Sequence, residues 1–255
     1  MIRKALIVLS IIAIALGWKI WSDTMSDPVI ERLTVTSEAL PTGSAPVRIA
    51  LVADIHMAGP DMPPERVARI VEQTNALGAD IIAVAGDLVS EKRTGTKVYT
   101  PSEVIAPLGA LQAPIGIVLV PGNHDHWYDW PALASELAKF PHITVLENEA
   151  MQLGPLALGG VDDDFTSHDD VSKTLEAMET LTGPRVILTH SPDIFPDLPN
   201  DIVLMMAGHT HCGQIAYPWG GSPAKMSRYG DAFACGVVEE DGKTLVTSAG
   251  LGTSI

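Results

Sequence analysis

Five short apolar runs recur along the chain, and each of them ends in polar residues. The runs cover residues 47–53, 81–85, 115–120, 185–189 and 202–207. A short apolar run bounded by turn residues is typical of a buried strand, because both faces of such a strand are covered. The pattern therefore predicts five interior strands.

Segments with helical periodicity lie between these strands. They cover residues 63–77, the stretch from Thr100 onwards, 130–139 and 171–181. The second begins with Thr100-Pro101-Ser102-Glu103, which has the spacing of a capping box, and Pro107 is expected to kink or shorten it. Asp129 is the expected cap of the third helix. Strands that alternate with helices predict an α/β fold.

The later part of the chain has a different pattern. Residues 151–159 are expected to form a short strand or a hairpin, and 232–238 and 244–248 flank the turn residues 239–242. Two apolar segments joined by such a turn predict a β-hairpin. Alternating strands and helices followed by hairpins agree with two sheets sandwiched between helices.

The chain opens with an apolar segment of another kind. Residues 5–18 are almost entirely apolar, and they lie between Arg3-Lys4 and Lys19. If Lys19 snorkels and the Trp residues lie at the interface, the segment reaches the lower limit of about 17 residues for a membrane span. No clear small-x-small cleavage site follows, so we expect an uncleaved transmembrane anchor over residues 1–22, with a removed signal peptide as the alternative.

The charges around this segment indicate its orientation. Arg3 and Lys4 precede it and Asp23 and Asp27 follow it, which places the N-terminus in the cytoplasm and the rest of the chain on the periplasmic or extracellular side of a bacterial inner membrane. Residues 23–45 are expected to be a linker or a leading strand. The remainder, 46–255, has the length of one α/β domain.

The polar residues at the ends of the five runs share one chemistry. They are Asp54, His56, Asp87, Asn123, His124, Asp125, His190, His209 and His211. Ligands gather at the carboxyl ends of strands in α/β sheets, and His nitrogen and Asp oxygen suit Zn, Mn and Fe. Asp54 and His56, like His209 and His211, are two residues apart and would fall on one side of an extended strand end.

Seven of these residues are potential metal ligands, which is too many for one ion. Two ions about 3.5–4 Å apart that share a bridging carboxylate would use all seven, and such a pair can generate hydroxide and clamp a phosphoryl group. The seven are Asp54, His56, Asp87, Asn123, His190, His209 and His211. No cysteine cluster is present, which argues against a structural zinc site.

The order of these motifs resembles the calcineurin-like metallophosphoesterase superfamily. Asp-x-His, Gly-Asp, Gly-Asn-His-Asp, His and Gly-His-Thr-His follow one another between residues 54 and 211. The segment 208–214 and the N-terminal apolar segment are similar to the membrane-anchored bacterial branch, which includes UDP-2,3-diacylglucosamine hydrolases. The resemblance implies the four-layer α-β-β-α sandwich of that family.

The resemblance also implies a role for each residue. Asp54, His56 and His211 would bind one metal, Asn123, His190 and His209 the other, and Asp87 would bridge both. His124 would contact the phosphate and stabilise or protonate the leaving oxygen, and Asp125 would orient His124.

The implied activity is hydrolysis of a phosphodiester or pyrophosphate bond with two divalent ions (Mn, Fe or Zn). The specific expectation is a small or lipid-linked substrate such as the nucleotide-sugar lipid of lipid A biosynthesis. A broad phosphomonoesterase and a catalytically impaired metal-binding protein are the alternatives.

Charge narrows the choice of partner. The formal net charge is −15, from 31 acidic and 16 basic residues, and no Lys/Arg-rich stretch appears. A general nucleic-acid binder needs a basic surface, so this class is disfavoured. Trp127, Lys225 and Arg228 are candidates for contacts with the substrate.

Three further features of the sequence are given no role in this site. His126 is interpreted as a partly exposed loop histidine. Cys212 and Cys235 do not make a disulfide scaffold, and a bridge between them is not predicted. The sequence stops at residues 250–255, where similar family members continue through an Arg-containing segment and a final strand, which leaves open a truncation of the domain.

Overall fold

A computed structural model of the chain describes residues 2–40, 43–213, 217, 221–222, 224 and 226–254. Two compact units are distinguished, Met1–Glu31 and Arg32–Ile255.

The first unit is dominated by helix α1, Ile2–Thr24. The helix is apolar on all sides and has no buried residue, and Lys19 and Asp23 form an ion pair of 2.9 Å near its end. Its 23 residues correspond to about 35 Å, which exceeds the thickness of a bilayer core of about 30 Å. By length and composition, this helix can cross a membrane.

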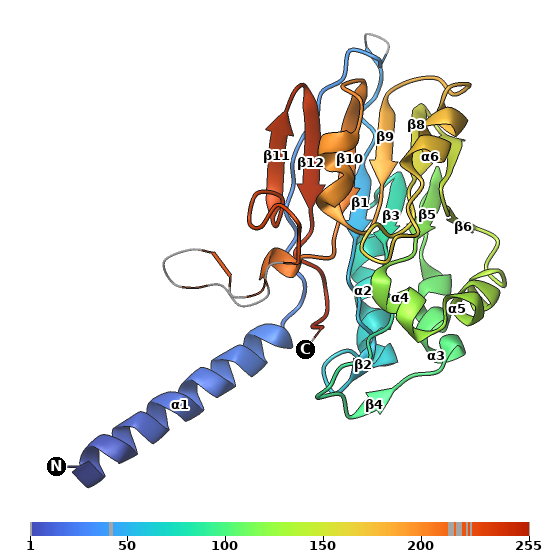
Figure 1. The fold of residues 1–255 in the computed structure, drawn as a ribbon. Helices are drawn as coiled ribbons and strands as arrows, with labels where there is room; N and C mark the ends of the chain where they lie inside the picture. Colours follow the sequence, from blue (N-terminus) through green and yellow to red (C-terminus); the bar gives the residue numbers. More distant parts are fainter. Residues whose placement is uncertain are drawn as a thin grey trace. The chain divides into compact units, whose positions relative to one another are not determined.

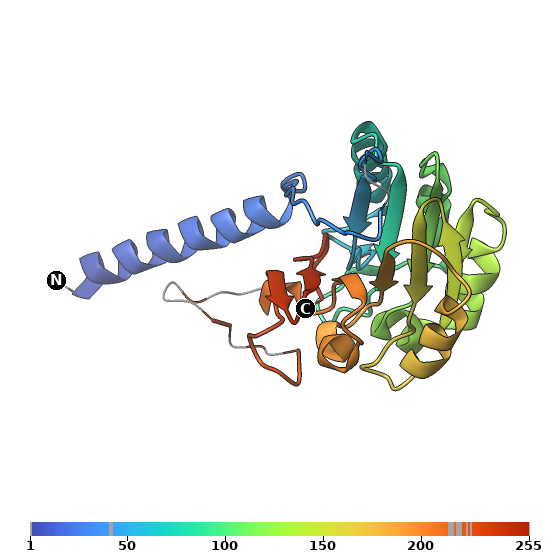
Figure 2. The ribbon, with the colours of Figure 1, turned by 90° about the horizontal axis from the view of Figure 1, so that it is seen from above.

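Two large sheets form the centre of the second unit (Figures 1 and 2). The first is entirely parallel, in the order β1 (Ile49–Val52), β3 (Ile81–Ala85), β5 (Gly116–Val120) and β6 (Ile143–Val145). The second has the order β11 (Gly236–Glu240), β12 (Lys243–Thr247), β10 (Ile202–Ala207), β9 (Arg185–Leu188), β8 (Leu156–Gly160) and β7 (Glu149–Leu153). Its four central strands are parallel and its two edge strands are antiparallel to their neighbours.

Three apolar cores separate four layers. In strand β3, Ile82 and Val84 face the helices, whereas Ile81 and Ala83 face the second sheet. The third core joins the second sheet to α6 (Val171–Met178) and the short 3₁₀ helix η2 (Pro192–Asp197). Because successive side chains alternate along a strand, an interior strand such as β3 contributes to two cores, and this explains why its sequence is apolar without interruption. The predicted four-layer α-β-β-α sandwich is confirmed.

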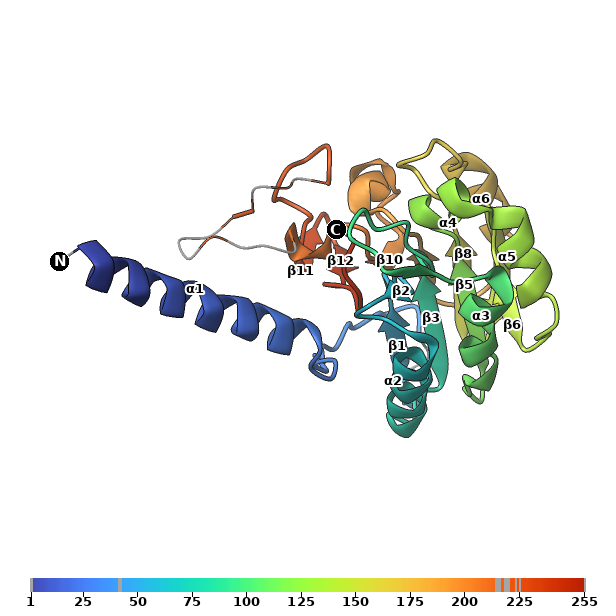
Figure 3. The same cartoon turned by 90° about the horizontal axis from the view of Figure 1, so that it is seen from below.

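The helices beside the first sheet, α2, α3 and α5, are labelled in Figure 3. Each begins within one residue of its expected start. Helix α2 covers Pro64–Ala76, and α5 covers Trp130–Leu137 behind the Asp129 cap. Helix α3, Pro101–Ile105, has the predicted capping box and changes into the 3₁₀ helix η1, Ala106–Ala110, at Pro107. Proline lacks the N–H that the α-helical pattern needs, which accounts for the change.

Other elements differ from the sequence-based expectation. Residues 151–159 do form a hairpin, of β7 and β8, as expected, but the last hairpin begins at Gly236 rather than at residue 232. Strand β6 and the two-residue strands β2 (Ala58–Gly59) and β4 (Lys97–Val98) were not expected, because they are too short to give a pattern. The described residues between Ser26 and Arg48 form no strand, which leaves the linker interpretation.

Candidate metal centre

Donor side chains from both sheets converge at the carboxyl ends of their strands. They follow β1, β3 and β5 of the first sheet and β9 and β10 of the second. Three groups of His and Asp have ligand atoms within 4.8 Å of one another, namely Asp54/His56/His211, His56/Asp87/His124 and Asp87/His190/His209. All seven predicted metal ligands are therefore brought together, since Asn123 contacts His190.

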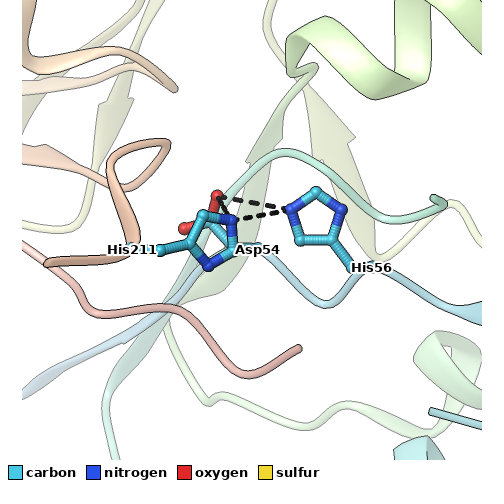
Figure 4. A group of neighbouring side chains, drawn as sticks. All are labelled: Asp54, His56 and His211. Atoms are coloured by element: carbon cyan, nitrogen blue, oxygen red, sulfur yellow. Dashed lines mark hydrogen bonds and ion pairs between the residues drawn. The ribbon is translucent and has the colours of Figure 1, made fainter. Parts of the chain in front are cut away.

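The first group joins the end of β1 to the end of β10. The two Nε2 atoms of His56 and His211 are 2.9 Å apart, and Asp54 Oδ1 lies 3.9 Å from the first and 3.5 Å from the second. These three side chains point at one another (Figure 4). Their nitrogen and oxygen atoms face one common point, as ligands of a single ion do.

The second group is built around His190. Its Nε2 lies 3.1 Å from Asn123 Oδ1 and 3.1 Å from His209 Nδ1. Its Nδ1 lies 2.7 Å from the carbonyl oxygen of Ala85 and can donate a hydrogen bond to it. That bond fixes the ring and leaves Nε2 as the atom that faces the site, which is the usual support for a metal-binding histidine.

Asp87 connects the two groups. Its Oδ2 lies 3.4 Å from His56 Nε2 in the first group and 3.2 Å from His190 Nε2 in the second. Its Oδ1 accepts a hydrogen bond of 2.8 Å from the backbone N–H of His124. One carboxylate oxygen thus faces both groups while the other is anchored to the backbone.

The backbone of the site is unusual. Asp54, His56, Asp87, His209 and His211 have φ values of 52°, 48°, 54°, 69° and 50°. Non-glycine residues rarely adopt this left-handed region, at a cost of about 1–3 kcal/mol each. The extended strand ends expected from the two-residue spacing are therefore wrong. Asp54 and His56 share a group because of these turns, and His209 and His211 lie in different groups.

Two glycines pack closely against the turn that carries Asp54 and His56. A Cβ atom on Gly208 would lie 2.4 Å from Asp54 Oδ2, and one on Gly252 would lie 2.2 Å from the carbonyl oxygen of Ile55. The Gly252 N–H donates a 2.7 Å bond to the carbonyl of Asp54. The segment around Gly252 therefore braces the turn that carries Asp54 and His56, a contact that the sequence analysis missed.

Asp125 does not have the contact expected of it. Its carboxylate accepts hydrogen bonds from the backbone N–H groups of Asp87 (2.8 Å), Leu88 (2.8 Å) and Gly122 (2.9 Å). No hydrogen bond to the His124 ring occurs among the residues that the structure describes. The idea that Asp125 orients His124 is therefore corrected: Asp125 fixes the turn that presents Asp87.

His124 lies beside the first group. Its ring meets His56 edge-on, with centroids 4.8 Å apart, and meets Trp127 edge-on at 5.0 Å. It is only partly buried, whereas His56 is fully buried. Burial lowers the pKa of His124 despite the opposing charge of Asp87.

The electrostatics of the site favour bound cations. Asp54 and Asp87 are 0% and 1% exposed, and no Lys or Arg pairs with either among the described residues. Burial raises the pKa of Asp54. Burial also acts to raise the pKa of Asp87, but the charges of His190 and His56 outweigh it and lower that pKa. Buried carboxylates need compensating charge, and the Asp, His and Asn donors are those that Mn, Fe and Zn accept. The residues thus fit divalent metal ions.

The comparisons with known proteins agree with this donor set. The family model of calcineurin-like phosphoesterases matches residues 47–233. The chain belongs to the calcineurin-like phosphoesterase family. This match confirms the resemblance to the calcineurin-like family that the sequence motifs indicate. Members of this family typically bind divalent metals.

Relatives of the domain occur in bacteria and animals. An uncharacterized metallophosphoesterase of Helicobacter pylori strain J99 is 28% identical over 92% of this chain and 61% of its own length. A Danio rerio protein named as a transmembrane protein with a metallophosphoesterase domain is 29% identical over 74% of this chain and 45% of its own length. The chain thus spans about half the length of the curated relatives it matches.

A solved structure shares the fold. The crystal structure of the protein TT1561 of Thermus thermophilus aligns with a TM-score of 0.51, covering 81% of this chain and 91% of that chain at 16% identity. This similarity concerns the phosphoesterase fold alone.

The three substrate-binding candidates have different environments. Trp127 is exposed and contacts His124, as described above. Arg228 forms ion pairs with Asp164 (3.2 Å) and Asp193 (3.7 Å), so its charge is already balanced by two carboxylates. Lys225 lies outside the described residues.

Cys212 and Cys235 form a disulfide, which the sequence analysis did not predict. The bridge connects the residue after His211 to the residue before β11. Thr210 strengthens the connection, because its Oγ1 donates a 2.7 Å hydrogen bond to the carbonyl of Ala234. Neither cysteine belongs to a recognisable spacing motif, so only their proximity in the fold reveals the pair.

Loss of this bridge is expected to destabilise the phosphoesterase domain. The cysteines are 23 residues apart, and a loop of this length implies about 3 kcal/mol in the loop-entropy model. Thermal unfolding with and without a reductant measures the effect. The Cys212→Ser, Cys235→Ser double variant is the control, since it should not respond to the reductant. An unchanged wild-type unfolding temperature after verified reduction would contradict the prediction.

His126 is partly exposed, as expected, but it does not lie in a loop. It lies in helix α4 (Asn123–Tyr128), and its Nε2 is 2.8 Å from Asp162 Oδ1. Its ring stacks on His168 with centroids 3.8 Å apart. Burial lowers the pKa of His126, but the hydrogen bond and charge of Asp162, with smaller contributions from Asp163 and Asp125, raise it overall.

This pair predicts a pH-dependent stability. The folded-state pKa of His126 lies above its ordinary value of 6.5. The contribution of protonated His126 to the free energy of unfolding is therefore complete below pH 6.5 and is lost as the pH rises through the folded-state pKa. Between about pH 6 and pH 9, the free energy of unfolding measured with a denaturant should therefore fall more for wild type than for His126→Gln. If the free energy of unfolding changed with pH equally in the two proteins, the His126–Asp162 pair would be excluded as a source of stability.

Proposed function

We propose that the protein is a dinuclear metal-dependent phosphoesterase that hydrolyses a phosphodiester or pyrophosphate bond. The position of Asp87 carries this proposal, because one of its oxygens faces His56 on one side and His190 on the other at 3.4 and 3.2 Å. A carboxylate shared by two ligand groups is the feature that a two-metal site needs and a single-metal site does not.

Each ligand group would hold one ion. Asp54, His56 and His211 form the first set, Asn123, His190 and His209 form the second, and Asp87 bridges them. The identity of the ions is proposed from donor chemistry as Mn, Fe or Zn. When bound, two such ions supply activated water and neutralise the charge of the phosphoryl oxygens.

The side chains around the ions have separate tasks. His124 would contact the phosphate and stabilise or protonate the leaving oxygen as the bond to phosphorus breaks. Its backbone N–H bond to Asp87 keeps the ring at the edge of the site. Asp125 contributes indirectly, because its three backbone hydrogen bonds hold the turn that positions Asp87.

The proposed substrate is an amphipathic phosphoester, with a nucleotide-sugar lipid as the specific candidate. An apolar N-terminal helix supports action beside a membrane, and exposed Trp127 next to His124 supports an aromatic or apolar substituent. The resemblance of the 208–214 segment to UDP-2,3-diacylglucosamine hydrolases motivates this choice.

The proposed location is a bacterial inner membrane, with residues 1–22 as anchor, 23–45 as linker and 46–255 as an extracytoplasmic domain. Arg3 and Lys4 precede the apolar helix, and basic residues remain in the cytoplasm. The Cys212–Cys235 disulfide gives independent support, because disulfides persist mainly in oxidising compartments. A phosphatase reporter that works only in the periplasm should be active when it is fused to the C-terminus. An inactive fusion would contradict this orientation.

Activity assays with defined metals test the proposed reaction. The metal-depleted full-length protein should be inactive, and added Mn should restore hydrolysis of bis(p-nitrophenyl) phosphate. The corresponding monoester separates the alternative, since a phosphomonoesterase would hydrolyse it faster than the diester. Failure to hydrolyse either compound with Mn, Fe or Zn would favour an impaired metal-binding protein, although all seven donors converge.

A further inference from the structure

Two exposed aromatic rings stand beside the metal centre. Trp127 is 51% exposed and Phe165 is 43% exposed. Their centroids are 6.1 Å apart, and the ring planes are inclined by 70°. The two rings therefore form a corner, which we call the Trp127–Phe165 corner.

This corner is joined to both halves of the site. Trp127 meets the His124 ring at 5.0 Å, and Phe165 meets the His209 ring at 4.6 Å. His124 is the proposed proton donor to the leaving group, and His209 is a proposed ligand of the second metal. A substituent on the leaving oxygen would consequently extend from His124 towards these two rings.

The segment that carries Phe165 is fixed although the ring is exposed. Asp163 Oδ2 accepts hydrogen bonds from Thr166 N (2.8 Å) and Thr166 Oγ1 (2.6 Å). On the other side, Arg228 donates a 3.2 Å bond to Asp164 Oδ1. Both neighbours of Phe165 are thus tied down, and the opposite ring is held in α4. Rings that are ordered before binding lose little freedom when a ligand arrives.

The surroundings favour a flat ligand over a flexible chain. An acyl chain needs an enclosed apolar groove to remove its surface from water. The cavities of about 480 Å³ beside α6 and about 330 Å³ beside the β11–β12 turn are lined by residues outside the site. The corner is open surface, where one planar ring can stack on one side chain and meet the other edge-on.

We propose that the Trp127–Phe165 corner binds the leaving group and selects phosphoesters whose leaving group carries a planar aromatic ring, either an aryl group or a nucleobase. This inference rests on the proposed phosphoesterase function and adds the class of leaving group. For an amphipathic nucleotide-lipid substrate, it assigns the corner to the base rather than to the acyl chains.

Binding of phosphonates to the Mn-loaded full-length protein tests the proposal without turnover. Phenylphosphonate and hexylphosphonate carry six carbons each, one as a flat ring and the other as a flexible chain, and methylphosphonate carries neither. Calorimetry should give a dissociation constant for phenylphosphonate about 25-fold below those of the other two, as expected for two aromatic contacts of about fivefold each. A nucleoside phosphonate in the same assay distinguishes a nucleobase from a simple aryl group.

Variants show whether the corner causes the preference. Trp127→Leu and Phe165→Leu should each raise the dissociation constant of phenylphosphonate about fivefold, whereas Trp127→Phe, which keeps a ring, should retain most of the preference. Tyr229→Leu is a matched control, because Tyr229 is 42% exposed and its ring packs on Phe233. Methylphosphonate reports any general damage to the metal centre.

Two results would overturn the inference. One is hexylphosphonate binding as tightly as phenylphosphonate, which would indicate an acyl site. The other is an unchanged preference in both leucine variants. Either result leaves the proposed hydrolysis intact, whereas phosphonate binding without any phosphoester turnover would reject the proposed function and leave the corner as a ring-binding site.

Discussion

Replacement of His124 with Ala is expected to lower turnover by about 10²–10⁴-fold, the range for loss of a general acid. His124 contacts His56 and Trp127 edge-on, its ring lies within 4.8 Å of the Asp87 carboxylate, and its backbone N–H donates a hydrogen bond to that carboxylate. Alanine keeps that N–H, so both metals should remain bound. Rates with bis(p-nitrophenyl) phosphate, measured together with the metal content of the purified protein, separate catalysis from metal binding.

The matched control is His142→Ala. His142 is exposed, and its ring contacts Phe140 rather than any site residue. Its loss should leave the rate close to that of wild type. If His124→Ala retained full activity, the assigned proton donor would be wrong. If it lost its metals, His124 would have to be regarded as a ligand.

Replacement of Asp87 with Asn is expected to have the second large effect. The amide has nearly the same shape but no charge, and one of its two terminal atoms is a donor, so it cannot bridge two cations as a carboxylate does. We expect the metal content to fall from about two ions to one or fewer and the rate to fall by about 10³-fold, which corresponds to several kcal/mol of transition-state stabilisation.

The control for this change is Asp201→Asn, which removes a surface carboxylate paired with Arg185. It should keep both metals and the wild-type rate. Full occupancy of both sites in Asp87→Asn, confirmed by anomalous scattering or mass spectrometry, would show that the carboxylate is not a shared ligand. The two-metal proposal would then need revision.

The sequence predicted much of the fold because its signals are local. Strands β3 and β10 begin and end where their apolar runs do. The capping box at Thr100 and the cap at Asp129 both form. These features depend on residues a few positions apart, so periodicity and cap chemistry are sufficient to find them.

Side-chain partners were harder to predict. Asp125 is adjacent to His124 in the chain, yet it contacts the backbone of Asp87 and Leu88, some 38 residues away. His126 is paired with Asp162, and Phe165 with Trp127, through contacts between helix α4 and the loop that follows β8. No local pattern encodes such contacts, because they depend on how the loops are placed after folding.

By itself, the sequence determined which donors the protein has, their order and the strands that carry them, since each follows a contiguous apolar run. Only the tertiary structure decided how they are aimed. His56 and His211 meet although 155 positions separate them, and left-handed turns at five donors set their directions. Packing of two sheets overrides the intrinsic preference of those residues, and such strain persists only where the surrounding fold fixes the backbone.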